Sequence, residues 1–420
     1  MKNVAVLVML VLITFSMGVA GNQIAKPVAA VSANEVQTEL ETEPETEPET
    51  TGEVVTVVTE KETEKAEPID EFISKMSIEE KVGQLFIVTP EAVMLNEKEQ
   101  EDGAPVTVAS GDMLARMAKY HIGGVIMFAS NITDPEQITL LNSSIKNKSS
   151  IVPFICVDEE GGFISRIANN DAFDVPKYES MRDVGGSKDT ESAKQVGVDI
   201  GTYLKEYGFN LNLAPVSDLD LGNAAIGSRA YSDNPTLTEN MVKSEIEGFH
   251  SVGVMCCAKH FPGHGGATGD THDGLADVEK NWDELLKNDL VPFKGAIDAN
   301  IDMIMVGHLL TSQITNDGLP ASLSKQMITD KLRGELGYNG VVITDSFAMG
   351  AITNNYTSVE AAVGALKAGA DIVLMPKSLD EAYAAVLDAV ESGEISEAQI
   401  NTHLKRVLTL KEKYGLVEFE

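Results

Sequence analysis

The stretch Lys259–Asp273 concentrates groups that handle protons, because it holds three of the chain's seven histidines. Pro262 and the glycines around it predict a loop, since proline and glycine interrupt regular structure. His260 and His264 are four residues apart, which is the spacing of a zinc-binding pair on a helix. Because the segment is predicted to be a loop, this spacing does not indicate a helical zinc site.

Asp270 and His272 are a second feature of the same loop. Only one residue separates them, and alternate side chains of an extended segment point to the same side. A carboxylate beside an imidazole holds the tautomer of the ring and raises its basicity, which suits general acid–base catalysis. The spacing therefore predicts a carboxylate–imidazole pair that can exchange a proton with a substrate.

Eight short apolar runs are predicted to be the strands that position this loop. Most of them are too apolar to keep one face in water, which is typical of parallel strands covered on both faces. The runs are Gly83–Val88, Gly123–Phe128, Pro153–Asp158, Phe209–Pro215, Gly253–His260, Asp302–His308, Gly340–Asp345 and Ala370–Met375.

Amphipathic segments with helical periodicity alternate with these runs. They are Thr190–Tyr207, Leu237–Ser251, Asp283–Ala299, Ser324–Leu336, Val359–Ala368 and Ser396–Tyr414. Repeated strand-then-helix units over about 350 residues predict an α/β fold, a single TIM (β/α)8 barrel in residues 68–420. A doubly wound open sheet is the alternative, but no glycine-rich nucleotide fingerprint follows the first run.

Polar residues stand where several of the predicted strands end. In a barrel, the carboxyl ends of the strands meet at one face and form the active site. The polar residues at these ends are therefore expected to converge on one pocket. They are Asp158 with Glu159 and Glu160, Asp218, Lys259 with His260, His308, and Asp345.

The loop motif resembles the signature of the β-N-acetylglucosaminidases of glycoside hydrolase family 3. The resemblance rests on Lys259–Gly265 followed by Asp270–His272, and it extends from about Ile69 to the C-terminus. Further segments agree in order: Gly123–Ile126, Val157–Arg166, Leu213–Asp218, Gly227–Arg229 and Val342–Ser346.

The resemblance implies a role for each matching residue. Asp345 is expected to be the nucleophile, and His272, oriented by Asp270, the acid/base. The residues expected to hold a terminal N-acetylglucosamine are Asp158, Arg166, Arg229, Lys259 and His260. The implied activity is that of a retaining exo-β-N-acetylglucosaminidase acting on peptidoglycan fragments or chito-oligosaccharides, with no cofactor and no metal.

Three other functions remain open on the residues alone. Another β-glycosidase of the same family is one of them, although family members of that kind take their acid/base from a second domain. A metal-dependent barrel hydrolase would use His260, His264, His272, His308 and Asp345 as ligands. A non-catalytic sugar-binding module would need Arg166 and Lys259 but neither Asp345 nor the Asp270–His272 pair.

The N-terminal residues and the charge indicate where the chain works. Residues 1–21 are predicted to be a signal peptide or an uncleaved N-terminal anchor. Residues 22–67 are rich in Glu, Thr and Pro and are predicted to be a disordered acidic linker. We therefore expect a secreted or cell-surface monomer. The net charge of −33 argues against nucleic acid and anionic membranes as partners.

The three cysteines, Cys156, Cys256 and Cys257, all fall in apolar runs. An odd, buried set does not form a disulfide framework. We expect plain core thiols.

Overall fold

The computed structural model describes residues 67–94, 104–147, 149–272 and 274–419, which belong to one compact unit. The predicted signal peptide or anchor, and the predicted linker apart from Glu67, lie outside the described residues. Over the described ranges, no helix is both long and apolar enough to cross a membrane.

Eight parallel strands form a barrel in which the order around the barrel is the order along the chain. They are β1 (Phe86–Val88), β2 (Gly124–Met127), β3 (Phe154–Val157), β6 (Leu211–Asn212), β7 (Met255–Phe261), β9 (Met303–Val306), β11 (Val341–Thr344) and β12 (Val373–Leu374). β12 pairs with β1, and a parallel bridge between Ile343 and Ile372 joins β11 to β12. The predicted barrel is confirmed, and the open-sheet alternative is wrong.

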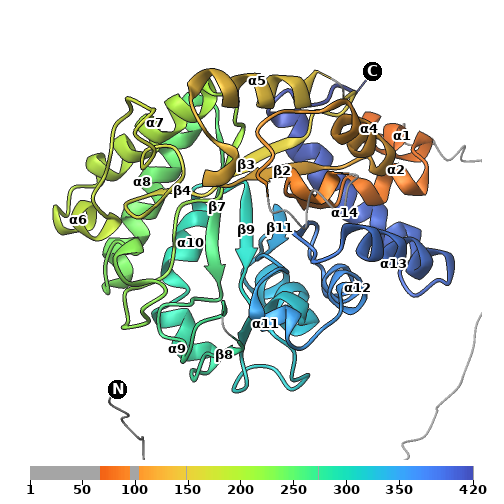
Figure 1. Ribbon diagram of the computed structural model, residues 1–420. Coiled ribbons are helices and arrows are strands. Elements are labelled where there is room, and N and C mark those ends of the chain that lie inside the picture. Colours follow the sequence, from red (N-terminus) through yellow and green to blue (C-terminus); the bar gives the residue numbers. More distant parts are fainter. Residues whose placement is uncertain (1–66, 95–103, 148, 273, 420) are drawn as a thin grey trace, which may run out of the picture. The chain divides into compact units, whose positions relative to one another are not determined.

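Helices surround the barrel, as Figure 1 shows, and every residue of the eight barrel strands is buried. They are α1 (Pro68–Lys75), α2 (Ile78–Gly83), α4 (Gly111–Tyr120), α5 (Pro135–Lys146), α6 (Met181–Gly186), α7 (Thr190–Glu206), α8 (Pro235–Val252), α9 (Trp282–Lys287), α10 (Val291–Asp298), α11 (Gly350–Thr353), α12 (Ser358–Ala368), α13 (Leu379–Glu391) and α14 (Glu397–Lys413). Burial of both faces explains why the strands read as continuous apolar runs.

Short elements complete the described part of the chain. Four short 3₁₀ helices and one π-helix occur: η1 (Glu91–Val93), η2 (Ala129–Asn131), η3 (Gly227–Arg229), η4 (Ala321–Leu323) and the π-helix η5 (Gln326–Glu335). Two small two-stranded sheets lie outside the barrel: β4 (Glu159–Gly161) with β5 (Ile164–Ser165), and β8 (Ala276–Asp277) with β10 (Leu309–Leu310).

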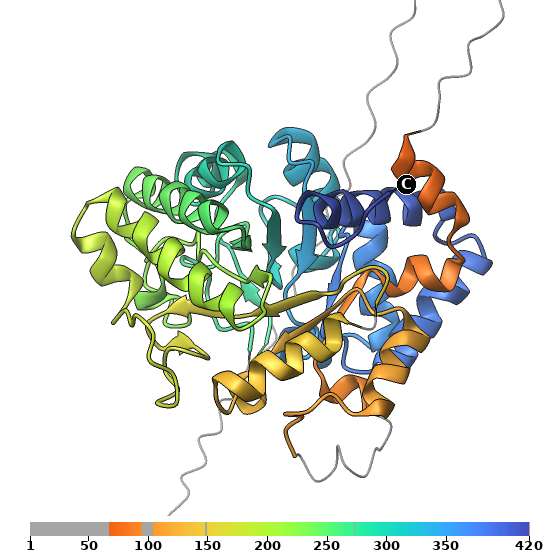
Figure 2. The same cartoon turned by 90° about the horizontal axis from the view of Figure 1, so that it is seen from above.

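The helices α7 and α8 lie side by side along the barrel in both views (Figures 1 and 2). Gly197 and Gly248 allow this close approach, because a Cβ at Gly197 would come 2.2 Å from Glu245 O, and one at Gly248 would come 2.2 Å from Lys194 O. Side chains at either position would push the two helices apart.

The helical prediction for Asp283–Ala299 is wrong in one respect, because this segment forms two helices, α9 and α10. Pro292 lies in the first turn of α10. Proline has no N–H to donate to the preceding turn, so it fits at the start of a helix and not in its interior. The helix is therefore interrupted between Lys287 and Val291.

The cysteines are free and buried, Cys156 in β3 and Cys256 and Cys257 in β7. Burial raises the pKa of all three thiols. They are core thiols, as predicted.

The two described ends of the chain pack together, with α1 against α14 (Figure 2). Lys405 of α14 binds Glu67 at 2.8 Å, directly before α1. Lys405 also lines a cavity with Asp302, which immediately precedes β9. Glu67 therefore lies at the face that the amino ends of the strands form.

Candidate active site

A cavity of about 370 Å³ opens at the carboxyl ends of the strands. It is lined by seven of the eight residues that the sequence predicts for the site, and the eighth, Asp270, is hydrogen-bonded to one of them. The seven are Asp158, Arg166, Arg229, Lys259, His260, His272 and Asp345. The structure thus brings the whole predicted set together.

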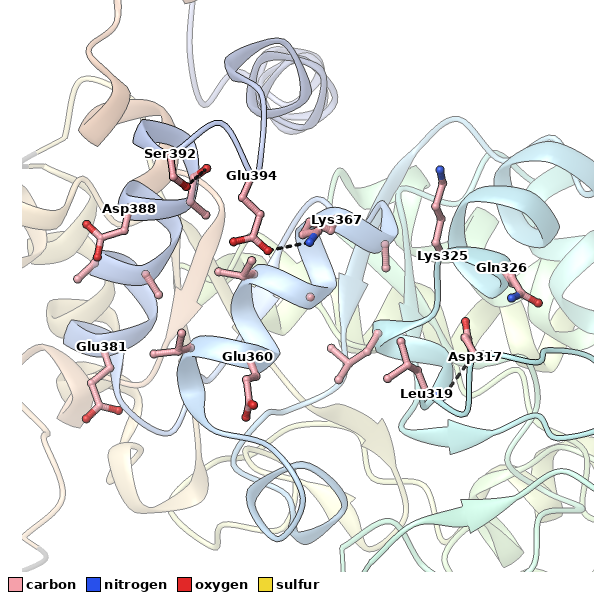
Figure 3. A pocket seen from close by; sticks show the side chains of 18 of the residues that line it. Asp317, Leu319, Lys325, Gln326, Glu360, Lys367, Glu381, Asp388, Ser392 and Glu394 are labelled. Carbon is pink, nitrogen blue, oxygen red and sulfur yellow. Dashed lines mark hydrogen bonds and ion pairs between the residues drawn. The ribbon is translucent and has the colours of Figure 1, made fainter.

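A larger cavity, of about 1190 Å³, lies elsewhere. Figure 3 shows it on the outside of the barrel, lined by α12, α13 and residues around Asp317 and Gln326. Its charged groups include Lys367, which is paired with Glu394 at 2.7 Å. It contains no carboxylate–imidazole pair, so the smaller cavity at the strand ends is the better candidate on its chemistry.

Four charged side chains form a connected row along one wall of the smaller cavity. Lys259 Nζ lies 2.7 Å from both Asp158 Oδ1 and Glu160 Oε1. Arg229 donates to both oxygens of Glu160, each at 2.8 Å. Burial would raise the pKa of Glu160, but Arg229 and Lys259 outweigh it and hold the pKa far below its usual value. Glu160 is therefore a carboxylate, and the row, rigidly held by its hydrogen bonds and ion pairs, offers donors and acceptors to sugar hydroxyls.

Arg166 is placed beside this row by its neighbour in the hairpin of β4 and β5. The carboxylate of Glu159 accepts the backbone N–H groups of Arg166, Ile167 and Ala168 at 2.6, 2.9 and 2.9 Å. The guanidinium of Arg166 lies 3.8 Å from Asp158 Oδ2. Glu159 thus fixes the backbone that carries Arg166.

Asp218 holds two histidines, His260 near the end of β7 and His264 in the loop that follows it. Its Oδ2 lies 2.7 Å from His260 Nδ1, and its Oδ1 accepts the backbone N–H of His264 at 2.6 Å. Burial would raise the pKa of Asp218, but His260 and His264 outweigh it and lower the pKa. An ionised Asp218 therefore fixes the orientation of the His260 ring in the cavity.

Asp345 directly follows β11 and accepts the N–H of Ser346 at 2.7 Å. Burial would raise the pKa of Asp345. Other groups outweigh burial and lower the pKa; in decreasing order of effect they are His308, His260, the N–H of Ser346 and Lys259. Burial lowers the pKa of His308, whereas Asp158 and Glu160 outweigh burial and raise the pKa of Lys259, which is therefore a cation at neutral pH. Asp345 is therefore a carboxylate at neutral pH, which is the form that a nucleophile needs.

His272 and Asp270 form the pair that their spacing predicts. His272 Nδ1 lies 2.8 Å from Asp270 Oδ1, and the side chains are 64% and 41% exposed. Hydrogen bonds from His272 outweigh burial and lower the pKa of Asp270. Because Asp270 occupies Nδ1, Nε2 is the nitrogen left to exchange a proton with a substrate.

The loop that carries His272 rests on the loop that follows Asp345. The carbonyl oxygens of Thr271 and His272 accept the N–H groups of Ala351 and Gly350 at 3.1 and 3.2 Å. These are the first residues of α11. The acid/base candidate and the nucleophile candidate are therefore joined through their backbones.

Asn223 fastens the other side of this loop. Its Nδ2 donates to Ala267 O and Gly269 O, both at 2.8 Å. Near it, a Cβ at Gly265 would come 1.7 Å from Leu219 O, so only glycine permits this approach.

The family resemblance assigns no catalytic or sugar-binding role to Glu160, Asp218 or His308, and the sequence analysis does not name Asn223 at all. The strand-end rule that finds Asp345 also singles out the first three, so that signal was available. Nothing in the sequence distinguishes Asn223, because its partners lie more than 40 residues further along the chain.

The metal alternative would need the histidines of the cavity to share an ion. Across the described residues, the group of three with converging ligand atoms is His250, Cys256 and Asp302. Cys256 is the second residue of β7, and Asp302 directly precedes β9, so the group is at the opposite end of the barrel. The residues of the metal alternative do not form such a group.

Residues 77–410 match the model of the glycosyl hydrolase family 3 N terminal domain. The chain is 32% identical over 337 residues to β-hexosaminidase A of Pseudoalteromonas piscicida, covering 74% of this chain and 56% of that enzyme. It is 36% identical over 293 residues to β-hexosaminidase of Stenotrophomonas maltophilia strain K279a, covering 68% and 84%.

Solved structures agree with the sequence matches. A glycoside hydrolase family 3 β-N-acetylglucosaminidase from Paenibacillus sp. str. FPU-7 superposes with a TM-score of 0.74 at 34% identity. The match covers 81% of this chain and 63% of that one. LpqI of M. tuberculosis gives a TM-score of 0.71 at 28% identity, covering 82% and 96%. The chain thus spans only part of some relatives and nearly all of others, and it belongs to glycosyl hydrolase family 3.

Proposed function

We propose that this chain is a retaining exo-β-N-acetylglucosaminidase that releases terminal N-acetylglucosamine from peptidoglycan fragments or chito-oligosaccharides. The observation that carries the proposal is one cavity that holds an ionised carboxylate, Asp345, and the carboxylate-paired imidazole of His272. The names of the family 3 relatives support the same chemistry.

The reaction runs in two steps. Asp345 attacks the anomeric carbon and forms a covalent bond to the sugar, while His272 protonates the glycosidic oxygen, which leaves as the aglycone hydroxyl. His272 then removes a proton from water, the water oxygen attacks the same carbon, and the bond to Asp345 breaks. Two displacements at one carbon retain its configuration.

The charged row supports the proposed exo action. Asp158, Lys259, Glu160 and Arg229 close one side of the cavity with side chains that hydrogen bonds and ion pairs hold in place. A terminal sugar can satisfy these groups with its hydroxyls, whereas a chain that continued past it would collide with them. Exported and monomeric states remain our proposals from the sequence alone.

The test is the configuration of the first product, followed by ¹H NMR during hydrolysis of an aryl β-N-acetylglucosaminide. We expect β-N-acetylglucosamine to form first. The Asp345→Asn variant should lose activity by several orders of magnitude, with an unchanged circular dichroism spectrum. The exposed Asp283→Asn is the matched control and should keep full activity. First formation of the α-anomer, or near-normal turnover by Asp345→Asn, would refute the proposal.

The role of His272 is tested by the leaving group. His272→Ala should slow substrates with poor leaving groups most, because their oxygen needs a proton. Azide should restore part of the rate on activated aryl glycosides by replacing the water that His272 activates. Equal losses on all substrates without azide rescue would assign the acid/base role to another residue.

A further inference from the structure

Three side chains converge at the face that the amino ends of the strands form. His250 lies in the last turn of α8, Cys256 is in β7, and Asp302 directly precedes β9. Gly253 ends α8 in the left-handed conformation and turns the chain into β7, which brings His250 close to Cys256. This face is opposite the catalytic cavity, so the proposed reaction gives the three side chains no role.

The ligand atoms of these side chains are spaced for one metal ion. His250 Nε2 lies 2.9 Å from Asp302 Oδ2 and 3.7 Å from Cys256 Sγ, and the sulfur lies 4.0 Å from the same oxygen. The point in their plane that is equally distant from all three atoms is about 2.1 Å from each. Zinc binds nitrogen and oxygen at about 2.0–2.2 Å and sulfur at about 2.3 Å. An ion at or slightly above this point therefore reaches all three ligands.

The types of ligand select the metal. A thiolate and an imidazole favour zinc, whereas magnesium and calcium prefer sites built from oxygen alone. Cys256 and Asp302 are buried, and the side chain of His250 is 25% exposed. Water can reach the group along the exposed edge of His250, so a water molecule can complete a tetrahedral set of four ligands.

Asp302 is held in place by further groups, as the carboxylate ligands of metal sites are. Lys413 Nζ lies 2.7 Å from its Oδ1 atom, and the hydroxyl of Tyr414 donates to its Oδ2 atom at 2.9 Å. The N–H of Cys256 also donates to Oδ2, at 3.2 Å. These contacts fix the orientation of the carboxylate and connect it to the end of α14.

We propose that His250, Cys256 and Asp302 form a structural zinc site that joins α8 to β7 and to the start of β9. The ion carries two positive charges, and the thiolate and the carboxylate carry two negative charges, so the complex of these groups is neutral in its buried surroundings. The proposal does not depend on the proposed function, because the site is remote from the catalytic cavity.

The protons balance as follows when the imidazole is neutral. Burial and the Asp302 carboxylate raise the pKa of the Cys256 thiol, so the sulfur is protonated before the ion binds. The ion forms a bond to sulfur as the thiol proton leaves for the solvent. It also takes the place of the Nε2 proton that faces Asp302, and the imidazole carries its proton on Nδ1 instead. One proton is therefore released for each ion.

Cobalt titration of the full chain, after its dialysis against a chelator, tests the proposal. A thiolate bound to Co²⁺ gives a charge-transfer absorption band in the near ultraviolet. We expect the band to saturate at one ion per chain and to disappear when Zn²⁺ is added. The apparent affinity should rise about tenfold per pH unit below the pKa of the thiol, because one proton leaves. Zinc at a hundredfold excess over its Kd should raise the Tm by about 3–4 °C.

Substitutions locate the ion. Cys256→Ser should lose the absorption band, and His250→Ala should lose the rise in Tm; because His250 is partly exposed, this second variant should fold even if the first does not. Cys257→Ser is the matched control, since successive side chains of a strand point to opposite faces, and it should keep both signals. His264→Ala, in the catalytic cavity, should keep them too.

Three results would overturn the proposal. The first is a wild-type chain that gives no thiolate band with Co²⁺. The second is a band that persists in Cys256→Ser, and the third is an equal rise in Tm with zinc in His250→Ala and wild type. Each of them would leave a hydrogen-bonded group without an ion, and none of them would affect the proposed function.

Discussion

Replacing Asn223 by alanine tests whether the structure holds the acid/base loop in its working position. Asn223 touches neither Asp345 nor His272, but its Nδ2 donates two hydrogen bonds to carbonyl oxygens of the loop. Asn223→Ala removes both of them. Each is worth about 1 kcal/mol net, so the docked loop should lose about 2 kcal/mol, which is a factor of about 30 in the docking equilibrium.

Hydrogen exchange measures this loss directly at Gly350 and Ala351. The first N–H groups of a helix have no acceptor within the helix, so these two depend on the carbonyl oxygens of His272 and Thr271. Undocking of the loop exposes them to solvent. In Asn223→Ala, we expect their exchange to speed up by about 30-fold and kcat/KM for a substrate with a poor leaving group to fall by up to the same factor.

Asn142→Ala is the matched control, because Asn142 also donates to a carbonyl oxygen, that of Tyr207 at 2.9 Å, but does so between helices away from the cavity. It should lower the stability of the fold and leave exchange at Gly350 and Ala351 unchanged at low denaturant. Equal exchange at these amides in Asn223→Ala and wild type would refute the idea that Asn223 fastens the loop.

Two further predictions concern buried carboxyl groups. Glu160→Gln should lower the free energy of unfolding by about 3 kcal/mol, because it leaves Lys259 and Arg229 without their shared anion. The same substitution should raise KM. Denaturant titration measures the stability and steady-state kinetics the KM, and an unchanged KM would contradict the binding role of the row. Burial raises the pKa of Glu245 to about 8. This carboxyl therefore stabilises the fold most below its unfolded pKa, and the stabilisation is lost as the pH rises toward 8. The free energy of unfolding of Glu245→Gln, relative to that of the wild type, should thus rise by about 2–4 kcal/mol between pH 5 and pH 8.5. A constant difference in the free energy of unfolding across that range would show that Glu245 is ionised throughout.

The strands were predictable because burial on both faces leaves an apolar run that few other structures share. Each predicted run overlaps one barrel strand, as Pro153–Asp158 contains β3, and only β7 extends past its run, by one residue to Phe261. Strand ends also pointed to Asp158, Lys259 and Asp345, since a barrel brings all carboxyl ends to one face. Arg166 follows β5 and Arg229 lies in η3, both outside the barrel strands, and they came only from the family resemblance.

What the sequence did not provide are contacts between distant loops. Arg229 pairs with Glu160 from 69 residues away, and no local pattern encodes that meeting. The same holds for Asn223, whose side chain is defined by what it reaches and not by its neighbours in the chain. The break between α9 and α10 was readable from Pro292, but the helical periodicity of the flanking residues outweighed it.

The contact between Lys405 and Glu67 decides how the enzyme can be attached to a surface. Glu67 lies at the face opposite the catalytic cavity. A tag joined before Glu67 is therefore attached at the face of the barrel opposite the cavity. An enzyme immobilised through this tag should present the mouth of the cavity to the solution. A bead coupled this way should retain its activity on large substrates. Coupling through cysteines introduced beside Ala348 should block large substrates before small ones.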